Sequence, residues 1–142
     1  MSNQAANPHT TPWPLRYLPQ LVNAGRFPLA ATDFREQYFS PQTHALHLHL
    51  YAGVVKIGST KFALAPGDVT LSPIRLPSYY HLPEPGQHWC VHFLPPSSPV
   101  SAADQIPFPW HISLGAQRDF GIERLRHVSR LFARGRHGGK AG

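Results

Sequence analysis

A chain of 142 residues suits one domain, and a domain of this size buries roughly 68% of the surface that its unfolded form exposes. Hydrophobic residues make up 42% of the sequence, which favours a folded protein, while sixteen prolines and eleven glycines argue against long helices. The formal charge of +6 is uneven, because residues 118–142 hold seven Arg and Lys against two acids, whereas residues 1–117 hold six against five. We therefore expect a nearly neutral body of short strands. At the C-terminal end we expect a basic helix face exposed to solvent, and the alternative is that this basic tail contacts nucleic acid.

The expected location is the cytoplasm, with no membrane contact. The single cysteine, Cys90, cannot form an intrachain disulfide. The first fourteen residues have neither the basic start nor the apolar run of a signal peptide, and no stretch approaches the ~20 apolar residues that span a membrane. These three observations fit a reducing compartment.

Residues 1–43 are expected to form an N-terminal arm and an irregular segment. The first fourteen residues are polar and rich in proline, which is typical of a loose arm. Residues 15–43 contain scattered apolar anchors, among them Leu18 and Phe27. We expect these anchors to hold the segment across the surface of the body without regular structure.

The informative region is residues 44–94, where apparent strands alternate with turns. Residues 44–51 switch strictly between apolar and polar side chains, and this period of two predicts a half-buried strand with chemically different faces. One face would carry Leu46, Leu48 and Leu50, and the other His47, His49 and Tyr51.

Further strands are predicted in the same region. A turn at Gly58 joins residues 54–57 to residues 61–64 in a hairpin. Pro66 and Gly67 suit a type II turn, whose second central residue needs a positive φ. The remaining strands are residues 69–71, 79–82 and 88–94, and the last alternates between two faces, with Trp89, Val91 and Phe93 on one and His88, Cys90 and His92 on the other.

The C-terminal part changes character. One more strand is predicted at residues 108–114, and Pro109 restricts it to the edge of a sheet. From Asp119 to about Arg134, apolar residues recur at helical spacing, with acids in the first turn and arginines after it. The predicted fold class is therefore all-β, a sandwich or barrel of short strands, with one C-terminal helix that ends at the glycines from 135 onward.

The order of elements resembles a known family. A strand ending in Gly, a hairpin, a Leu-x-Pro-Gly-Asp turn, a strand ending in Pro, a loop to Tyr and His, and a Trp-containing strand ending in Phe follow one another. This series is similar to the cupin core in the N-terminal, effector-binding half of AraC-family transcription regulators. The elements that carry it are Gly53, Gly58, Leu64–Asp68, Leu71–Pro73, Tyr80, His81 and Trp89–Phe93.

The resemblance implies a cupin double-stranded β-helix, a jelly-roll barrel, over residues 44–114. Residues 115–142 would be a linker and dimerisation helix with a basic tail. It also implies a domain that senses a small-molecule effector, such as a sugar, and passes its occupancy to a partner domain or subunit. Contact with DNA would go through the helix-turn-helix half of the family, which is not in this sequence.

The expected effector site combines rings with polar groups. Aromatic rings suit the apolar face of a sugar or another small ring, while imidazole and hydroxyl groups fix its polar edge. The predicted ligand-binding residues are His47, His49, Tyr51, Ser78, Tyr80, His81, Trp89 and His92. For Trp89 the alternative is ordinary core packing with Val91 and Phe93.

The alternative function is a metal-dependent cupin enzyme, an isomerase or a dioxygenase. His47 and His49 share one strand face and have the spacing of two ligands for a divalent transition metal. The sequence departs from the family here, because no Glu follows at residues 53 and 54, and Ser78 stands where the family carries a His. The candidate metal set is His47, His49, His81 and His92, and the effector-binding function itself needs no cofactor. No nucleophile motif or carboxylate pair predicts other catalysis.

A homodimer is expected through the C-terminal helix. Its apolar stripe consists of Ile122, Leu125, Val128, Leu131 and Phe132. A single helix on a small barrel would leave part of this stripe uncovered, and a two-fold mate would cover it. In the alternative, the stripe packs on the sheet of its own chain and the protein is a monomer.

Overall fold

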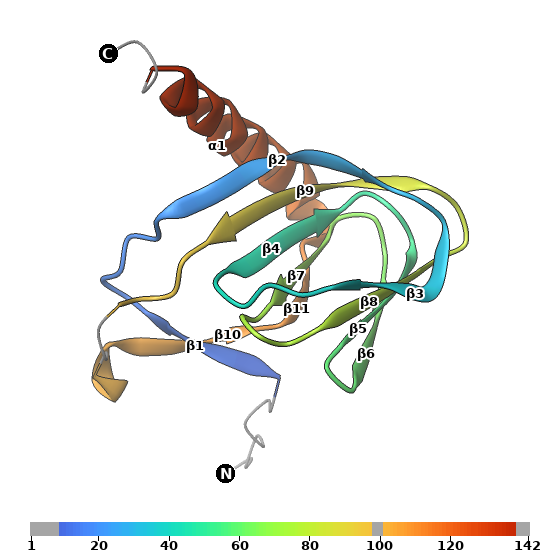
Figure 1. The fold of residues 1–142 in the computed structure, drawn as a ribbon, viewed down its shortest axis with the longest axis horizontal. Coiled ribbons are helices and arrows are strands. Elements are labelled where there is room, and N and C mark those ends of the chain that lie inside the picture. Colours follow the sequence, from blue (N-terminus) through green and yellow to red (C-terminus); the bar gives the residue numbers. More distant parts are fainter. Residues whose placement is uncertain (1–8, 98–100, 139–142) are drawn as a thin grey trace.

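The computed structural model describes residues 9–97 and 101–138 (Figure 1). Strands dominate it, and one α-helix, α1 (Arg118–Gly138), follows them. The strands are β1 (Thr10–Pro14), β2 (Leu21–Leu29), β3 (Thr32–Tyr38), β4 (His44–His49), β5 (Gly53–Ile57), β6 (Thr60–Leu64), β7 (Asp68–Ser72), β8 (Ser78–Leu82), β9 (Gly86–Phe93), β10 (Gln105–Pro109) and β11 (His111–Ser113). They form a two-stranded sheet β1-β10, a five-stranded sheet β11-β7-β4-β9-β2 and a four-stranded sheet β3-β8-β5-β6.

The two larger sheets face each other. The chain passes from one to the other repeatedly, since β2, β4, β7 and β9 belong to the five-stranded sheet and β3, β5 and β8 to the four-stranded one. The Ser78 hydroxyl of β8 donates a hydrogen bond of 3.0 Å to the Ser72 hydroxyl of β7, across the space between the sheets. The predicted β-rich fold with a C-terminal helix is confirmed, whereas the described sheets do not close into a barrel (Figure 1).

Strand β4 at the centre of the five-stranded sheet is buried on both of its faces. Leu48 of its apolar face is 1% exposed and packs with Val69 and Trp89, beneath Ile122 and Leu125 of α1. Figure 1 shows α1 lying along β2 and β9 on this outer side of the sheet. The leucines of β4 therefore fill a core between the sheet and the helix, outside the space between the two sheets.

The far end of the same outer face is covered by the two-stranded sheet. Trp13 of β1 meets the ring of Phe93 edge-on, with centroids 5.2 Å apart, and Phe108 of β10 packs in the same cluster. Between the two large sheets a second core gathers around Val55, Tyr80 and Leu82. Truncating a side chain as buried as Leu48 to Ala costs about 2–5 kcal/mol, so both cores contribute to stability.

The turn between β6 and β7 follows its sequence prediction. Gly67 has a φ of +96°, and the Asp68 amide donates to the Ala65 carbonyl at 3.0 Å, as a type II turn requires. The Asp68 carboxylate accepts from the Ala65 amide, from the Ser113 hydroxyl at 2.8 Å, and pairs with His111 at 2.9 Å. Asp68 thus fixes the turn and holds edge strand β11 against β7.

The prediction of an irregular N-terminal segment is wrong. Residues 10–38 contain β1, β2 and β3, so the segment is not irregular, although residues 1–8 lie outside the described part. The prediction failed because β2 and β3 lack a regular apolar period and gain their hydrogen bonds from β9 and β8, which are distant in sequence. The helix continues past Arg134 and Gly135 and ends at Gly138, among the glycines where its end was expected, because a single glycine weakens a helix without ending it.

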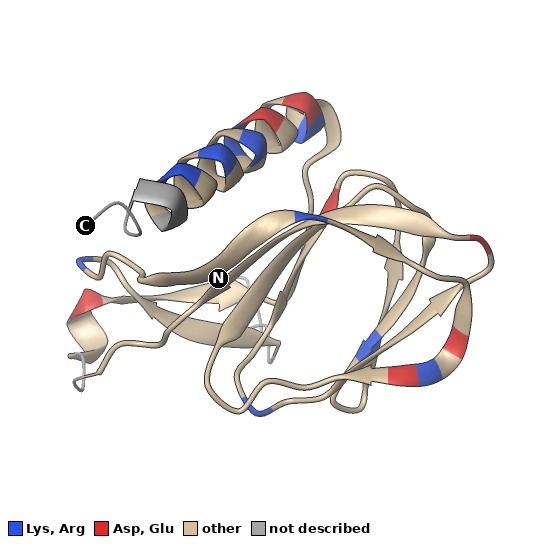
Figure 2. Cartoon of the chain, turned by 45° about the horizontal axis from the view of Figure 1, so that its top comes forward, with Lys and Arg blue, Asp and Glu red and all other residues tan. Residues whose placement is uncertain are grey.

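Charge gathers on the helix, as the sequence predicted. Figure 2 shows Lys and Arg repeated along α1, whereas the sheets carry few charged side chains. Arg124, Arg130 and Arg134 are exposed, so this basic face is solvated. No helix within the described residues is both long and apolar enough to cross a membrane.

The close approach of β5 to β8 gives a prediction about two glycines. A Cβ at Gly53 would lie 2.6 Å from the carbonyl oxygen of His81, whereas a Cβ at Gly135 meets nothing within 4 Å. Gly53→Ala should therefore lower the free energy of unfolding by about 1–3 kcal/mol. The matched variant Gly135→Ala should raise it by about 0.5–1 kcal/mol, because Ala favours the helix. Urea unfolding measures both, and equal effects of the two variants would contradict this account of β5.

Candidate functional site

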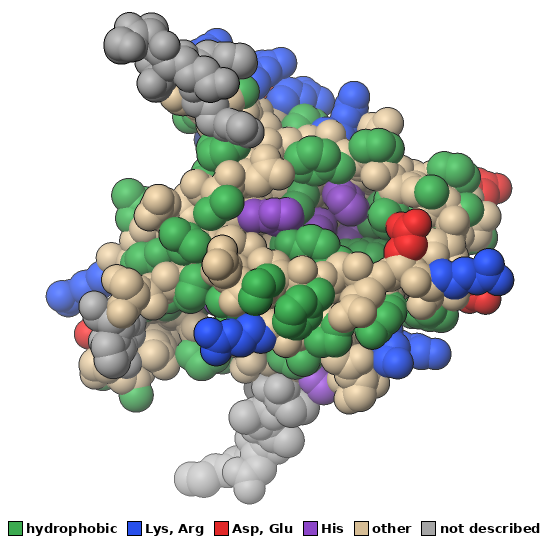
Figure 3. Space-filling view, viewed as in Figure 1, with side chains coloured by type: hydrophobic (Ala, Val, Ile, Leu, Met, Phe, Trp, Pro, Cys, Tyr) green, Lys and Arg blue, Asp and Glu red, His purple; other side chains and the backbone are tan. Residues whose placement is uncertain are grey.

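The candidate site is a cavity of about 300 Å³ between the two larger sheets, here called the histidine cavity. Figure 3 shows histidine side chains at the bottom of a hollow near the centre of one face of the molecule. The lining is mixed, with imidazole, phenol, amide, thiol and apolar groups and one carboxylate. The lining residues are Asn23, Phe27, Leu29, Glu36, Gln37, Tyr38, His47, Tyr80, His88, Cys90 and His92.

The register of β4 against β9 brings the nitrogen and sulfur groups together. His47 lies directly opposite Cys90, and His49 directly opposite His88. Directly paired residues of an antiparallel sheet share a face, with Cβ atoms about 4.5–5.5 Å apart. His92 is two residues beyond Cys90 on the same strand, so its side chain points to the same face and lies diagonal to His47.

A buried hydrogen-bond network supports one side of this cluster. The Tyr51 hydroxyl lies 2.8 Å from His49 Nδ1 and 3.0 Å from His88 Nδ1, and joins the two rings. The second nitrogen of His49, Nε2, lies 2.8 Å from the Thr70 hydroxyl. Both nitrogens of His49 are thus satisfied within the protein, and its ring is fixed in place.

Two polar atoms at the cavity differ from this network. His47 Nδ1 and the Tyr80 hydroxyl are buried, and neither makes a hydrogen bond of normal geometry to another described residue, although the Ser72 hydroxyl lies near enough to Tyr80 to lower its pKa slightly against the larger effect of burial. Their side chains are 3% and 5% exposed. Because a buried polar group without a partner costs about 1–3 kcal/mol, such groups call for an explanation, and a ligand in the cavity would supply one.

Burial keeps these imidazoles neutral at physiological pH. Desolvation, followed by the neighbouring His88, lowers the pKa of His49 to about 3. Desolvation and His92 lower the pKa of His88 to about 4, and burial also lowers the pKa of His47 and of His92. Neutral imidazoles can accept a hydrogen bond or coordinate a metal ion, so the cavity offers several nitrogen lone pairs.

The phenols and the thiol at the cavity are likewise neutral. Burial raises the pKa of Cys90 to about 12 and that of Tyr38 to about 12. The Tyr38 hydroxyl lies 3.1 Å from His92 Nε2 and holds that ring at the more open side of the cavity. Cys90 therefore has no features of a nucleophile, which requires a thiolate at neutral pH.

One group of donor atoms could hold a metal ion. One donor atom each from His47, Cys90 and His92 lies within 4.8 Å of the other two. The metal set predicted from the sequence is not brought together, because His81 points to the opposite face of β8 and pairs with Asp33 at 2.9 Å. His49 has both nitrogens in hydrogen bonds and is not free to bind a metal ion. The group in the structure thus contains Cys90 in place of the predicted ligands His49 and His81.

The structure sorts the eight predicted ligand-binding residues into three groups. His47, Tyr80 and His92 line the cavity. His49, Tyr51 and Ser78 are buried nearby but are hydrogen-bonded to protein groups. His81 and Trp89 do not belong to the site, contrary to the prediction. Each is next in sequence to a residue whose side chain points into the cavity, so its own side chain points to the opposite face of the strand. Trp89 packs beneath α1, which is the core alternative that the sequence left open.

Several lining residues were not predicted. His88 and Cys90 share the alternating face of β9 with His92, and this alternation was a signal that could have added them. Phe27 and Tyr38 lie on β2 and β3, in the segment expected to be irregular. No local pattern marks these two, since only the pairing of β2 with β9 and of β3 with β8 carries them to the cavity.

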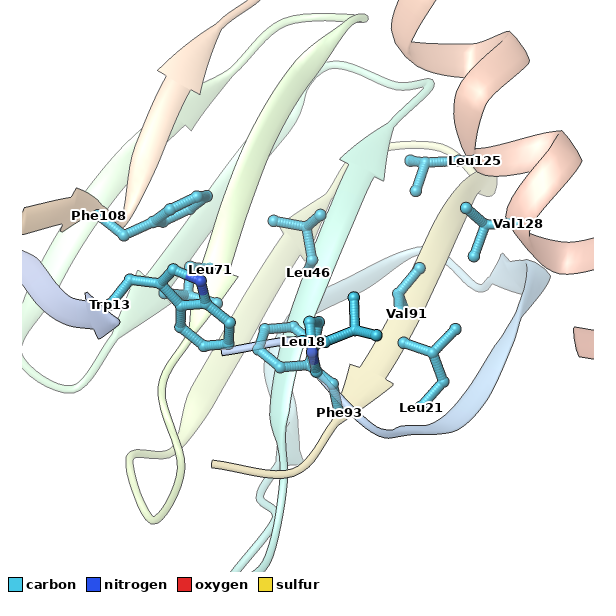
Figure 4. A pocket seen from close by; sticks show the side chains of 11 residues that line it. Trp13, Leu18, Leu21, Leu46, Leu71, Val91, Phe93, Phe108, Leu125 and Val128 are labelled. Carbon is cyan, nitrogen blue, oxygen red and sulfur yellow. The ribbon is translucent and has the colours of Figure 1, made fainter. Parts of the chain in front are cut away.

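A larger hollow lies on the outer face of the five-stranded sheet. It has a volume of about 460 Å³ and is closed on one side by Leu125 and Val128 of α1 (Figure 4). Trp13 and Phe108 of the two-stranded sheet close the other side. Its walls are almost entirely apolar side chains that continue the core beneath the helix, and among these side chains only Trp13 carries a polar group that could orient a ligand.

The comparisons with known proteins add no family. No protein-family model matches the chain, and no curated protein matches it.

The low histidine pKa values predict how stability depends on pH. An unfolded histidine titrates near pH 6.5, whereas folded His49 and His88 titrate at about 3 and about 4. The unfolded chain thus binds more protons below pH 6.5. The free energy of unfolding therefore has its maximum contribution from these histidines above pH 6.5. It falls as the pH drops towards 4, by on the order of 1 kcal/mol per pH unit for each histidine.

Urea unfolding at pH 7, 6 and 5, after treatment with a chelator, measures this loss. His88→Gln should reduce the slope, whereas His127→Gln, at an exposed position of α1, should leave it unchanged. A stability that is the same at pH 7 and pH 5 would show that these histidines are not held neutral.

Proposed function

We propose that the chain is a small-molecule-binding domain that senses an effector in the histidine cavity. The observation that carries this proposal is that His47 and Tyr80 both line one cavity and that each has a buried polar atom, Nδ1 and the hydroxyl, without a hydrogen bond of normal geometry. Groups of this kind lose hydrogen bonds when the protein folds and regain them when a ligand binds. A polar ligand between the sheets would satisfy both.

The size and the lining of the cavity favour a neutral, hydroxyl-bearing ligand such as a monosaccharide. A volume of about 300 Å³ is at the lower end of small-molecule sites, so a dinucleotide or a long chain would not fit. Phe27 and Tyr38 offer rings for the apolar face of a sugar, and Asn23 and Gln37 offer amides for its hydroxyls. Neutral imidazoles provide no strong attraction for an anion.

The cupin jelly roll and the AraC-type role belong to the same proposal. Two facing sheets with the chain alternating between them, followed by a terminal helix, are what such a domain would need. The type II turn at Gly67 lies in the stretch that resembles the cupin core of AraC-family regulators, and its conformation is the one expected there. Effector occupancy would then be passed to a partner domain or subunit in a cytoplasmic protein. The alternative, a metal-dependent cupin enzyme using His47, His49 and either His81 or His92, has less support, because both nitrogens of His49 are in hydrogen bonds and His81 lies outside the cavity.

Tyr80 and Tyr79 provide a matched test, since they are neighbours on β8 that point to opposite faces. Tyr80→Phe removes an unsatisfied hydroxyl, so the ligand-free protein should be as stable as the wild type or up to about 1 kcal/mol more stable. Its affinity for the effector should fall about tenfold, because one hydrogen bond to the ligand is lost. Tyr79→Phe should change neither quantity.

The measurements are a thermal-shift screen of monosaccharides and small aromatic compounds, followed by calorimetric titration of the hits. A screen in which no compound stabilises the wild type would overturn the proposal. Equal affinities of the two tyrosine variants for a confirmed ligand would place its site elsewhere.

We also propose that the chain forms a homodimer through α1. The packing of the helix on its own sheet decides which residues are suitable for testing this. Leu125 and Val128 pack on the sheet of their own chain, whereas Leu131 is 51% exposed. Leu125→Glu should therefore destabilise the monomer fold by burying a charge, which makes it unsuitable as an interface probe. Leu131→Glu should keep the fold and halve the mass that light scattering measures.

The control for this test is Ala133→Glu, which adds the same charge at another exposed position of the helix. It should leave the mass unchanged. A wild-type protein that is already monomeric at high micromolar concentration would refute the dimer, whatever the variants do.

A further inference from the structure

The cluster of His47, Cys90 and His92 has a geometry that hydrogen bonding does not explain. One donor atom from each residue lies within 4.8 Å of the other two. In a tetrahedral zinc site, with Zn–S near 2.3 Å and Zn–N near 2.05 Å, neighbouring donor atoms are about 3.4–3.6 Å apart. Closing the cluster around an ion thus requires shifts of about 1 Å, which small rotations of two imidazoles and one thiol would supply.

The surroundings of the cluster favour metal coordination over internal hydrogen bonding. His47 is 3% exposed, and its Nδ1 has no partner among the described residues. His49, on the same strand face, has both nitrogens bonded to hydroxyl groups and is therefore not available. The fold thus satisfies one of these two histidines completely and leaves the other with an unused lone pair.

The strand register makes the cluster rigid. Because His47 and Cys90 form a direct cross-strand pair in the middle of the five-stranded sheet, backbone hydrogen bonds hold their relative positions. The Tyr38 hydroxyl, 3.1 Å from His92 Nε2, fixes the third ring. Partners of this kind orient the histidines of metal sites and strengthen binding.

We propose that His47, Cys90 and His92 form a transition-metal site that binds one zinc ion per chain. Two imidazoles and a thiolate are a donor set that suits zinc or copper and does not suit calcium or magnesium, which prefer oxygen. On binding, the Cys90 sulfur forms a bond to the metal and its proton passes to the solvent. All three residues line the histidine cavity, so an ion can enter from there.

Three protein ligands leave a fourth coordination position open towards the cavity. Sites with three protein ligands keep water or a ligand atom at this position, whereas structural zinc sites are closed by four protein ligands. The ion would therefore face whatever occupies the histidine cavity. The inference goes beyond the effector proposal and does not rest on it, because the protein can bind the ion without any organic ligand.

The test uses the full chain, stripped of metal with a chelator and titrated with Co²⁺ as a spectroscopic substitute for zinc. Tetrahedral coordination gives Co²⁺ intense visible bands, and a thiolate ligand adds a charge-transfer band in the near ultraviolet. Because Cys90 is the only cysteine in the sequence, that second band can arise from no other residue of the chain. We expect both bands to saturate at one Co²⁺ per chain and to disappear when one equivalent of Zn²⁺ is added.

Variants identify the ligands. Cys90→Ala and His92→Ala should each weaken Zn²⁺ binding by roughly 100-fold or more in competition with a chromophoric chelator, since even the loss of an outer-shell partner costs 10–100-fold. The control His127→Ala removes an exposed histidine of α1 and should leave the affinity unchanged. Thermal unfolding of the metal-free variants shows whether each of them is folded.

The wild-type spectrum decides the question even if a variant does not fold. Co²⁺ binding without the thiolate band, or no binding at micromolar Co²⁺ and Zn²⁺, would overturn the zinc site. An intense visible band with Cu²⁺, together with a wild-type zinc affinity no tighter than that of Cys90→Ala, would overturn the choice of zinc and indicate copper. The sugar screen in the presence of chelator tests the effector proposal separately, so the failure of one leaves the other standing.

Discussion

Strand β4 is buried on both faces, and the two faces need different kinds of side chain around them. On the outer face Leu48 needs apolar partners, which α1 and the adjoining strands β7 and β9 supply. On the inner face His47 and His49 need polar partners or must stay unsatisfied at a cost. The second sheet covers this inner face, so histidines lie where a sandwich of two sheets would otherwise be filled by aliphatic side chains.

The polar side chains of the inner face are only partly satisfied by hydrogen bonds within the protein. Tyr51 and Thr70 satisfy His49, and the same Tyr51 hydroxyl reaches His88. His47 and Tyr80 keep unpaired atoms beside a cavity, which a well-packed core would not contain. Reduced stability at such positions is typical of binding sites. Here it falls on Tyr80, which would contact the proposed effector, and on His47, which would contact both the effector and the proposed metal ion.

Prediction from the sequence succeeded where a pattern was local. The alternation at residues 44–51, the turn at Gly67 and the spacing after Asp119 predicted β4, a turn and α1. It failed where hydrogen bonds come from distant strands, as for β2 and β3, whose residues carry no regular period. The candidate site shows the same division, because His47, Tyr80 and His92 were predicted, whereas Tyr38 was not. His81 and Trp89 were also predicted to bind the ligand, but they lie on the other faces of their strands.

The sequence by itself determined that β4 and β9 each have an apolar and a polar face, because alternation along a strand is a property of the chain. It could not determine which face lies between the sheets, since both are buried. That choice was made by α1, whose Ile122 and Leu125 cover the leucine face and leave the histidine face for the second sheet. The pairing of His47 with Cys90 was likewise decided only by the register between strands that are about forty residues apart, where backbone hydrogen bonds and burial select one alignment.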